Sequence, residues 1–129
     1  MAIAALSAVA LLAAGCGRDD FKNDPRPPTP LEVTVEMTDK AVQVAPANFG
    51  AGLVNFVIAN TSDNDAVFEI KGPVDERSST IPARGNTVFK VQLKQGSYEA
   101  SAHDSDTVEP AQIEVGPERA SAQNDLLLP

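Results

Sequence analysis

Residues 31–37 read LEVTVEM, with an apolar side chain at every second position from Leu31 to Met37. Side chains of a β-strand point alternately to the two faces of a sheet, so this pattern predicts a half-buried strand. Six further runs also predict strands: residues 42–44, 53–60, 66–72, 87–93, 97–102 and 111–115. An eighth, short strand could form near Ser79–Ile81.

The apolar positions of these runs are expected to form the core. They share an inward face with Leu31, Val33, Val35 and Met37, and they are Val54, Phe56, Ile58, Ala66, Phe68, Ile70, Phe89, Val91, Leu93, Tyr98, Ala100, Ala102, Ala111, Ile113 and Val115. Aromatic residues make up only 5% of the chain and Trp is absent, so the core is built mainly from aliphatic side chains.

Short runs rich in Gly, Asn, Asp and Pro separate the predicted strands and predict turns at residues 49–52, 60–65, 82–86 and 94–96. No helix of useful length is predicted. Seven or eight short strands at this spacing predict an all-β fold, an antiparallel Greek-key β-sandwich over residues 31–116. Residues 117–129 have no period and are expected to be a disordered tail, in which the leucines at 126–128 could pack back or contact a partner.

Charge and composition exclude several classes of function. The formal net charge is -8, whereas nucleic-acid binding needs a basic footprint. A single cysteine cannot form an internal disulfide, and a single histidine leaves little room for histidine-based catalysis. The chain also lacks a nucleophilic-triad pattern and a glycine loop for phosphate, so we do not expect an enzyme.

The first segment, residues 1–15, is uncharged and too short to span a bilayer, which needs roughly 20 apolar residues. It is typical of a signal peptide. Residues 12–16, LAAGC, resemble a bacterial lipobox, which implies cleavage before Cys16 and acylation of that residue. Several acyl chains would anchor the protein stably to a lipid bilayer. The alternative is an ordinary buried cysteine in an apolar helix.

Signal peptides normally open with Lys or Arg, and none precedes this apolar run. We therefore expect the true start codon to lie upstream of Met1. Residues 16–30 combine Cys16 with a polar stretch that contains four prolines, which favours an extended tether. At roughly 3 Å per residue, such a tether reaches about 40 Å from the membrane.

The order of motifs from residue 31 to residue 116 resembles that of cupredoxin-like domains, in particular the EfeO-type group of bacterial periplasmic and surface proteins. The motifs are NFVIAN at 55–60, FEI at 68–70, IPARG at 81–85 and Gly96-x-Tyr98. Members of this group are linked to iron or copper handling in the envelope. Tyr98 resembles the tyrosine corner of β-sandwiches, with its ring in the core and its hydroxyl on a nearby backbone group. We interpret it as structural.

A blue-copper site needs two His and one Cys, usually with a weak axial Met. The resemblance places the first His at Ala66 and the Cys at Ala102, or at Ser101 if the register shifts by one. His103 follows, but no Met lies beyond it. Copper is therefore not expected, and the resemblance concerns the fold, which does not carry a function with it.

Another metal remains an alternative. The loop HDSDTVE offers His103, Asp104, Asp106 and Glu109, with Glu69 and Glu99 on neighbouring predicted strands. Carboxylates with one imidazole suit Mn, Fe, Ca or, less selectively, Cu(II). The competing interpretation is an acidic loop that is simply solvated.

Two functions follow from these observations. The first is a lipid-anchored accessory or binding module without a cofactor, facing the periplasm or the exterior, with an envelope protein of unknown identity as its partner. The second is a metal-binding (iron or copper) carrier or uptake accessory protein that uses a carboxylate/His site. Convergence of the side chains of His103, Asp104, Asp106 and Glu109 would favour the second.

Overall fold

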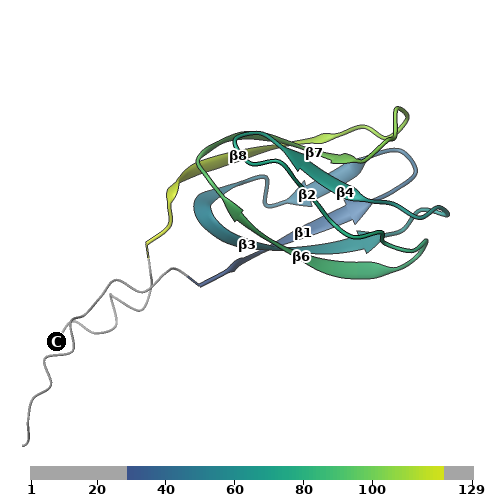
Figure 1. Cartoon of the computed structure of the whole chain (residues 1–129), viewed down its shortest axis with the longest axis horizontal. Helices are drawn as coiled ribbons and strands as arrows, with labels where there is room; N and C mark the ends of the chain where they lie inside the picture. Colours follow the sequence, from purple (N-terminus) through teal and green to yellow (C-terminus); the bar gives the residue numbers. More distant parts are fainter. Residues whose placement is uncertain (1–28, 121–129) are drawn as a thin grey trace, which may run out of the picture.

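The computed structural model describes residues 29–120, which form two β-sheets packed face to face (Figure 1). This range contains no helix that is long and apolar enough to span a bilayer. The expected signal peptide, Cys16, most of the tether and the leucines at 126–128 lie outside the described residues.

The eight strands are β1 (Leu31–Met37), β2 (Val42–Ala45), β3 (Asn48–Asn60), β4 (Phe68–Lys71), β5 (Glu76–Arg77), β6 (Asn86–Leu93), β7 (Gly96–Ala102) and β8 (Ala111–Glu118). One sheet has the order β2-β1-β3-β6 and the other has the order β3-β8-β7-β4-β5, so β3 belongs to both. The predicted all-β sandwich is confirmed. An antiparallel sandwich was expected, and its pairing differs in one detail: it is mixed, because β3 runs parallel to β1 and to β8.

Strand β3 differs most from the prediction. A turn was expected at residues 49–52, but the strand continues through them and its pairing with β8 shifts between Gly50 and Ala51. Such a bulge bends a strand. Gly52 adopts a positive φ of 134°, which side chains other than glycine rarely allow. The bend carries the chain from one sheet into the other, as the curved ribbon of β3 in Figure 1 shows.

Two strand boundaries also differ. The run predicted at 66–72 begins its ladder only at Phe68, while Ala66 forms a single bridge with Ile81, and the short extra strand lies at Glu76–Arg77. Strand β8 continues to Glu118, and the backbone N–H of Arg119 donates to Ala51 O, 3.1 Å away. The expected start of the tail at residue 117 was therefore wrong, because long-range pairing with β3 holds these residues.

The core lies between the two sheets and consists of the alternate apolar positions. The rings of Phe56 and Phe68 are in contact, with centroids 5.3 Å apart, and Phe89 packs on both. Val33, Ile58 and other inward side chains are fully buried. Each such side chain contributes roughly 1.5–3 kcal/mol when removed from water.

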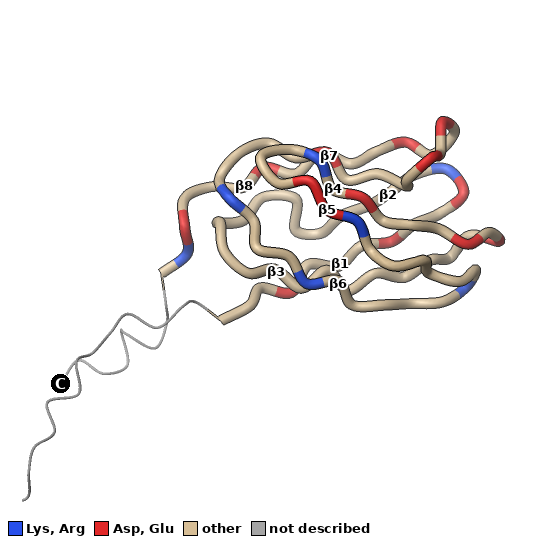
Figure 2. Tube along the Cα trace, in the orientation of Figure 1, with Lys and Arg blue, Asp and Glu red and all other residues tan. Residues whose placement is uncertain are grey.

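The two ends of the sandwich differ in character. Leu31 pairs with Val54 and Glu118 pairs with Ala51, so the described chain enters and leaves at the same end, near the bend in β3 (Figure 1). The loops at the opposite end carry most of their charge as Asp and Glu (Figure 2). A pocket opens among these loops.

Candidate functional site

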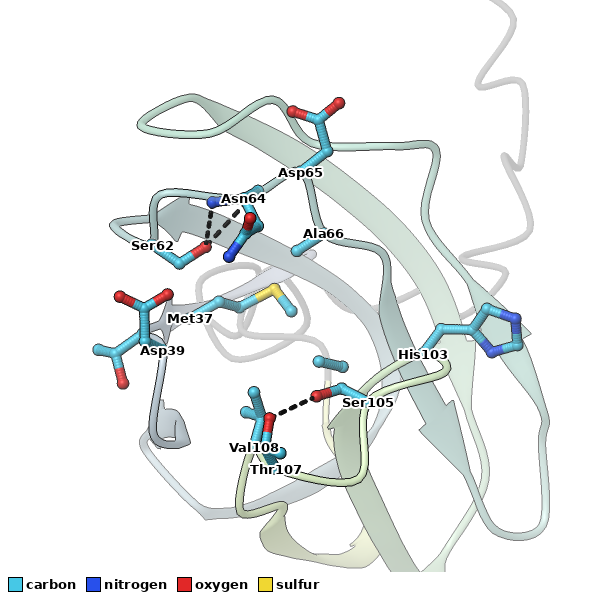
Figure 3. Close-up of a pocket in the computed structure, with 12 residues that line it drawn as sticks. Met37, Asp39, Ser62, Asn64, Asp65, Ala66, His103, Ser105, Thr107 and Val108 are labelled. Carbon is cyan, nitrogen blue, oxygen red and sulfur yellow. Dashed lines mark hydrogen bonds between the residues drawn. The ribbon is translucent and has the colours of Figure 1, made fainter.

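The pocket has a volume of about 150 Å³ and is lined by parts of residues 37–39, 62–66 and 102–108 (Figure 3). These segments follow the ends of β1, β3 and β7, which the sandwich brings to one end. Pockets that hold organic ligands usually measure roughly 300–1,000 Å³. This pocket has room for an ion, waters or a single side chain.

Ala66 and Ala102 both line the pocket. These are the positions at which the resemblance placed a copper-binding His and Cys. Ala102 pairs with Phe68 in the ladder between β4 and β7, whereas Ser101 pairs with Glu69 and does not line the pocket. Ala66 and Ala102 therefore lie together at the pocket without the one-residue shift to Ser101. Each of the two side chains offers only a methyl group.

Met37 also lines the pocket, and its side chain points into it (Figure 3). An axial methionine was considered only beyond His103, where the chain has none. That reasoning missed Met37, which reaches this end because β1 runs parallel to β3 and pairs Met37 with Asn60. The sequence feature that could have identified it is the position of Met37 as the last inward-facing residue of LEVTVEM.

His103 lines the wall of the pocket, but its ring points away from the interior (Figure 3). Its Nδ1 lies 2.9 Å from Glu69 Oε2, and its Nε2 lies 2.8 Å from Arg77 Nη1. An Arg N–H can donate only to an unprotonated ring nitrogen, so these contacts favour the tautomer with its proton on Nδ1. Asp104 Oδ2 is 3.1 Å from Nε2 and is a partner for the doubly protonated ring.

Glu69 is the carboxylate most affected by this histidine. Its side chain is 12% exposed, and Lys71 Nζ lies 3.5 Å from its Oε1. The hydrogen bond from His103 lowers the pKa of Glu69 and, together with Lys71, outweighs the opposite effect of burial. Glu69 was considered a secondary metal candidate, and the structure instead makes it the partner that orients His103.

The four main metal candidates do not converge. Within residues 29–120 there is no group of three or more His, Cys, Asp or Glu side chains arranged to hold a metal ion. The side chain of Asp104 is 86% exposed, and Asp106 also lies at the surface of the loop. Glu109 is fixed by its backbone, which bonds to Lys40 and Val42, and Glu99 lies exposed on β7.

Asn60 holds the loop that forms one wall of the pocket. Its side chain is 1% exposed, and its Nδ2 donates to the backbone oxygens of Asn64, Ile81 and Pro82. Its Oδ1 accepts from the N–H and hydroxyl of Ser62. One side chain therefore ties two loops together at the rim.

The donor set does not fit a blue-copper ion. The pocket offers the thioether of Met37 and several oxygens, but no thiolate and no inward imidazole. The oxygens of Asp39 and Ser62 are hard ligands, which suit cations that prefer carboxylate and hydroxyl groups. The carboxylate of Asp65 instead points away from the pocket and accepts from Ala83 N (Figure 3).

No family model and no curated protein matches the chain. Among solved structures, a multicopper oxidase is similar to it with a TM-score of 0.52 and 17% sequence identity. The fold is cupredoxin-like. The similarity covers 70% of this chain and 46% of the oxidase chain, so this chain spans less than half of that protein. At this identity the likeness concerns the fold alone.

Proposed function

We propose that this chain is an exported, lipid-anchored protein of the cell envelope, in which an EfeO-type cupredoxin-like domain acts as a non-catalytic binding or accessory module without blue copper. The observation that carries the proposal is the pair Ala66 and Ala102, which line one pocket where the resemblance expects a copper-binding His and Cys. Two methyl groups cannot replace an imidazole and a thiolate as ligands.

The contacts of His103 support the same proposal. Both ring nitrogens are already engaged, by Glu69 on one side and by Arg77 on the other. Binding a metal would require His103 to give up Arg77 and to turn its ring. The histidine thus has a structural partner on each side instead of a free nitrogen facing the pocket.

The arrangement of the ends supports an anchored module. The proposed anchor, Cys16, precedes β1 by a proline-rich segment, and β1 starts at the end opposite the pocket. A tether from Cys16 would therefore present the acidic loops and the pocket away from the membrane. This geometry suits a domain that meets a partner in the envelope.

A metal carrier is the second candidate, and one observation favours it. Asp39 and Asp65 both line the pocket from different loops, together with Ser62 and Asn64, while one carboxylate oxygen of Asp65 accepts from Ala83 N. Oxygen ligands of this kind suit Mn, Fe or Ca.

Calorimetry of the full chain in detergent separates the two candidates. We would titrate Cu(II), Fe(II), Fe(III) and Mn(II) into the wild type, His103→Ala and Asp39→Asn. The module predicts no binding tighter than about 0.1 mM for any of them. One tight equivalent that is lost in either variant would replace the module with the carrier. Loss in Asp39→Asn would place the metal at the pocket, and loss in His103→Ala would place it at the histidine on the pocket wall.

The anchor has its own test. Wild type and Cys16→Ser would be expressed in a bacterial host that is fed a labelled fatty acid, and the membrane fraction would be collected. We expect label and membrane association in the wild type and neither in Cys16→Ser. An unlabelled wild-type protein in the aqueous fraction would refute the lipid anchor.

A further inference from the structure

Strand β6 forms a long open edge of the sandwich. It pairs with β3 and with no other strand of residues 29–120, and it extends over Asn86–Leu93 (Figure 1). Its backbone makes no other backbone hydrogen bond within the described domain. The other edges are shorter, with four residues in β2, two in β5 and residues 48–51 of β3. An edge of this length can pair with another polypeptide, and natural proteins usually block such edges.

One row of the face beside this edge is uncharged, between rows that contain Glu36 and Lys90. Val88 is 61% exposed and Val57 is 38% exposed, and these two are the exposed large hydrophobic side chains of the described residues. They are partners in the ladder between β3 and β6. Thr34 continues the row on β1, so an uncharged strip crosses the sheet and ends at the open edge.

The charge of this edge is opposite to that of the protein. Residues 78–98 contain Arg84, Lys90 and Lys94 but no Asp or Glu, in a chain of net charge -8. Lys90 is the one charged residue of β6 itself, and the trace of β6 in Figure 2 accordingly shows no acidic position. Neither Lys90 nor Lys94 forms an ion pair within residues 29–120. The open edge therefore offers unpaired positive charge beside an exposed valine.

We propose that the free edge of β6 binds an extended acidic segment of a partner protein, which adds to the sheet as a further strand. Its backbone would pair with Asn86–Leu93, an apolar side chain would lie on Val88, and carboxylates would face Lys90 and Lys94. Backbone bonds supply affinity in this mode of recognition, and alternate side chains supply specificity. The inference rests on the proposed function as a binding module and names the surface and the chemistry of its partner.

Charge selects this occupant over a second copy of the chain. Two β6 strands that paired with each other would bring two lysine-bearing edges together, and like charges across a ladder are destabilising. An acidic strand instead neutralises both lysines. Binding a partner strand also does not require two membrane-anchored copies to adopt one fixed relative orientation, as a dimer through β6 would.

The probe is the fluorescein-labelled heptapeptide Asp-Val-Val-Val-Asp-Val-Asp, titrated with the full chain in detergent and followed by anisotropy. Hydrogen exchange with mass spectrometry would locate the contact. We expect saturable binding with protection confined to residues 86–93. The same peptide with Lys in place of Asp, or with two valines replaced by proline, should bind at least about tenfold more weakly, because it loses the charge match or the backbone pairing.

Variants of exposed residues keep the test independent of folding. Val88→Asp and Lys90→Glu should each weaken the acidic peptide about five- to tenfold or more, whereas the matched reversal Lys40→Glu, on an exposed loop outside β6, should change binding less than about twofold. Equal binding of the acidic and basic peptides, protection away from β6, or no binding up to about 1 mM would overturn the proposal.

Sedimentation would detect the competing occupant. A dimer that dissociates on Val88→Asp would show that a second copy occupies the edge and would also overturn the proposal. The metal titration described above tests the pocket, which is a different part of the molecule from the edge of β6. If the chain binds a metal tightly and also binds the peptide, only the proposed function is refuted. If the chain binds neither a metal nor the peptide, only this inference is refuted.

Discussion

Arg119 lies across Gly52 so closely that a Cβ atom on Gly52 would be 2.9 Å from the Nη2 atom of the arginine. The guanidinium donates to the backbone oxygens of Ala51 and Leu53, on either side of this glycine. Burial lowers the pKa of Arg119, as expected for a cation that exchanges water for carbonyl groups. The end of β8 thus fastens the bend at which β3 changes sheets.

Replacing the guanidinium should loosen this bend. Arg119→Met keeps the aliphatic stem but loses the charged donors to Ala51 and Leu53, so we expect the free energy of unfolding to fall by about 2 kcal/mol. Urea denaturation would measure it. Arg84→Met, which removes an exposed ion pair with Asp63, is the matched control and should leave the midpoint unchanged within error. Equal effects of the two variants would show that Arg119 does not hold the bend.

Tyr98→Phe should cost about 1 kcal/mol. The hydroxyl of Tyr98 accepts from Lys94 N at 3.0 Å and donates to Lys94 O at 2.7 Å, while the ring is 1% exposed. Phenylalanine keeps the ring, and water can reach the backbone of the exposed Lys94, which limits the loss. Calorimetry should show a melting temperature lower by roughly 4–8 °C. An unchanged melting temperature would mean that the corner is not stabilising.

Tyr98 also predicts that the folded state loses stability at alkaline pH. Burial raises the pKa of Tyr98 above its usual 10.0, which means that the folded state favours the neutral phenol. This contribution to stability is complete below pH 10 and is lost as the pH rises through the folded value. Tyr98 is the only tyrosine of the chain, so its near-ultraviolet absorbance reports the titration directly. Ionisation at the value of a free tyrosine would contradict the buried corner.

Asn60→Asp should be among the most damaging isosteric changes. The amide of Asn60 donates to three carbonyl oxygens, and a carboxylate would place a buried negative charge against them. We expect a loss of about 3 kcal/mol or more. Asn64→Asp, four residues away and exposed, makes the same chemical change without burial and should be nearly neutral. Similar urea midpoints for the two variants would refute the role assigned to the Asn60 amide.

Stability should also depend on Glu69 in acid. The pKa of Glu69 is lowered below its usual 4.5 by His103 and Lys71, so its contribution is present above pH 4.5 and is lost as the pH falls through the folded value. Glu69→Gln should therefore flatten the loss of stability between about pH 5 and pH 3. Glu99→Gln, on the exposed face of the adjacent strand β7, should keep the wild-type profile. Urea midpoints across this range would test both variants, and parallel profiles for Glu69→Gln and wild type would count against the pair.

The alternation of apolar residues was sufficient to predict most of the core. In LEVTVEM the inward set follows from the two-residue repeat of a strand alone, and Val33, Val35 and Met37 are all buried. The all-β class followed from the same repeat in later runs. A repeat states which face is inward but not which strands are neighbours, so the parallel pairing of β1 with β3 could not be read from it.

The errors arose where distant residues decide local structure. Gly50 and Gly52 predict a turn from their immediate sequence, yet pairing with β8 and the hydrogen bonds of Arg119 keep the strand continuous through them. Residues 117–119 show no alternation of apolar residues, so no strand was predicted there. Arg119 holds this segment through its guanidinium and backbone and not through an apolar face. The contact of His103 with Glu69 joins residues 34 positions apart in the chain, which no local pattern encodes.

The placement of β1 has a mechanical consequence. The strand is paired along its length with β3 and over its second half with β2, and it starts at the end where the chain enters the domain. A pull on the preceding segment, directed away from the domain, runs along β1 and loads these ladders in shear. All of their hydrogen bonds then share the force, whereas a pull across the strand would open them one after another. A domain held from this end resists traction along the segment that precedes β1.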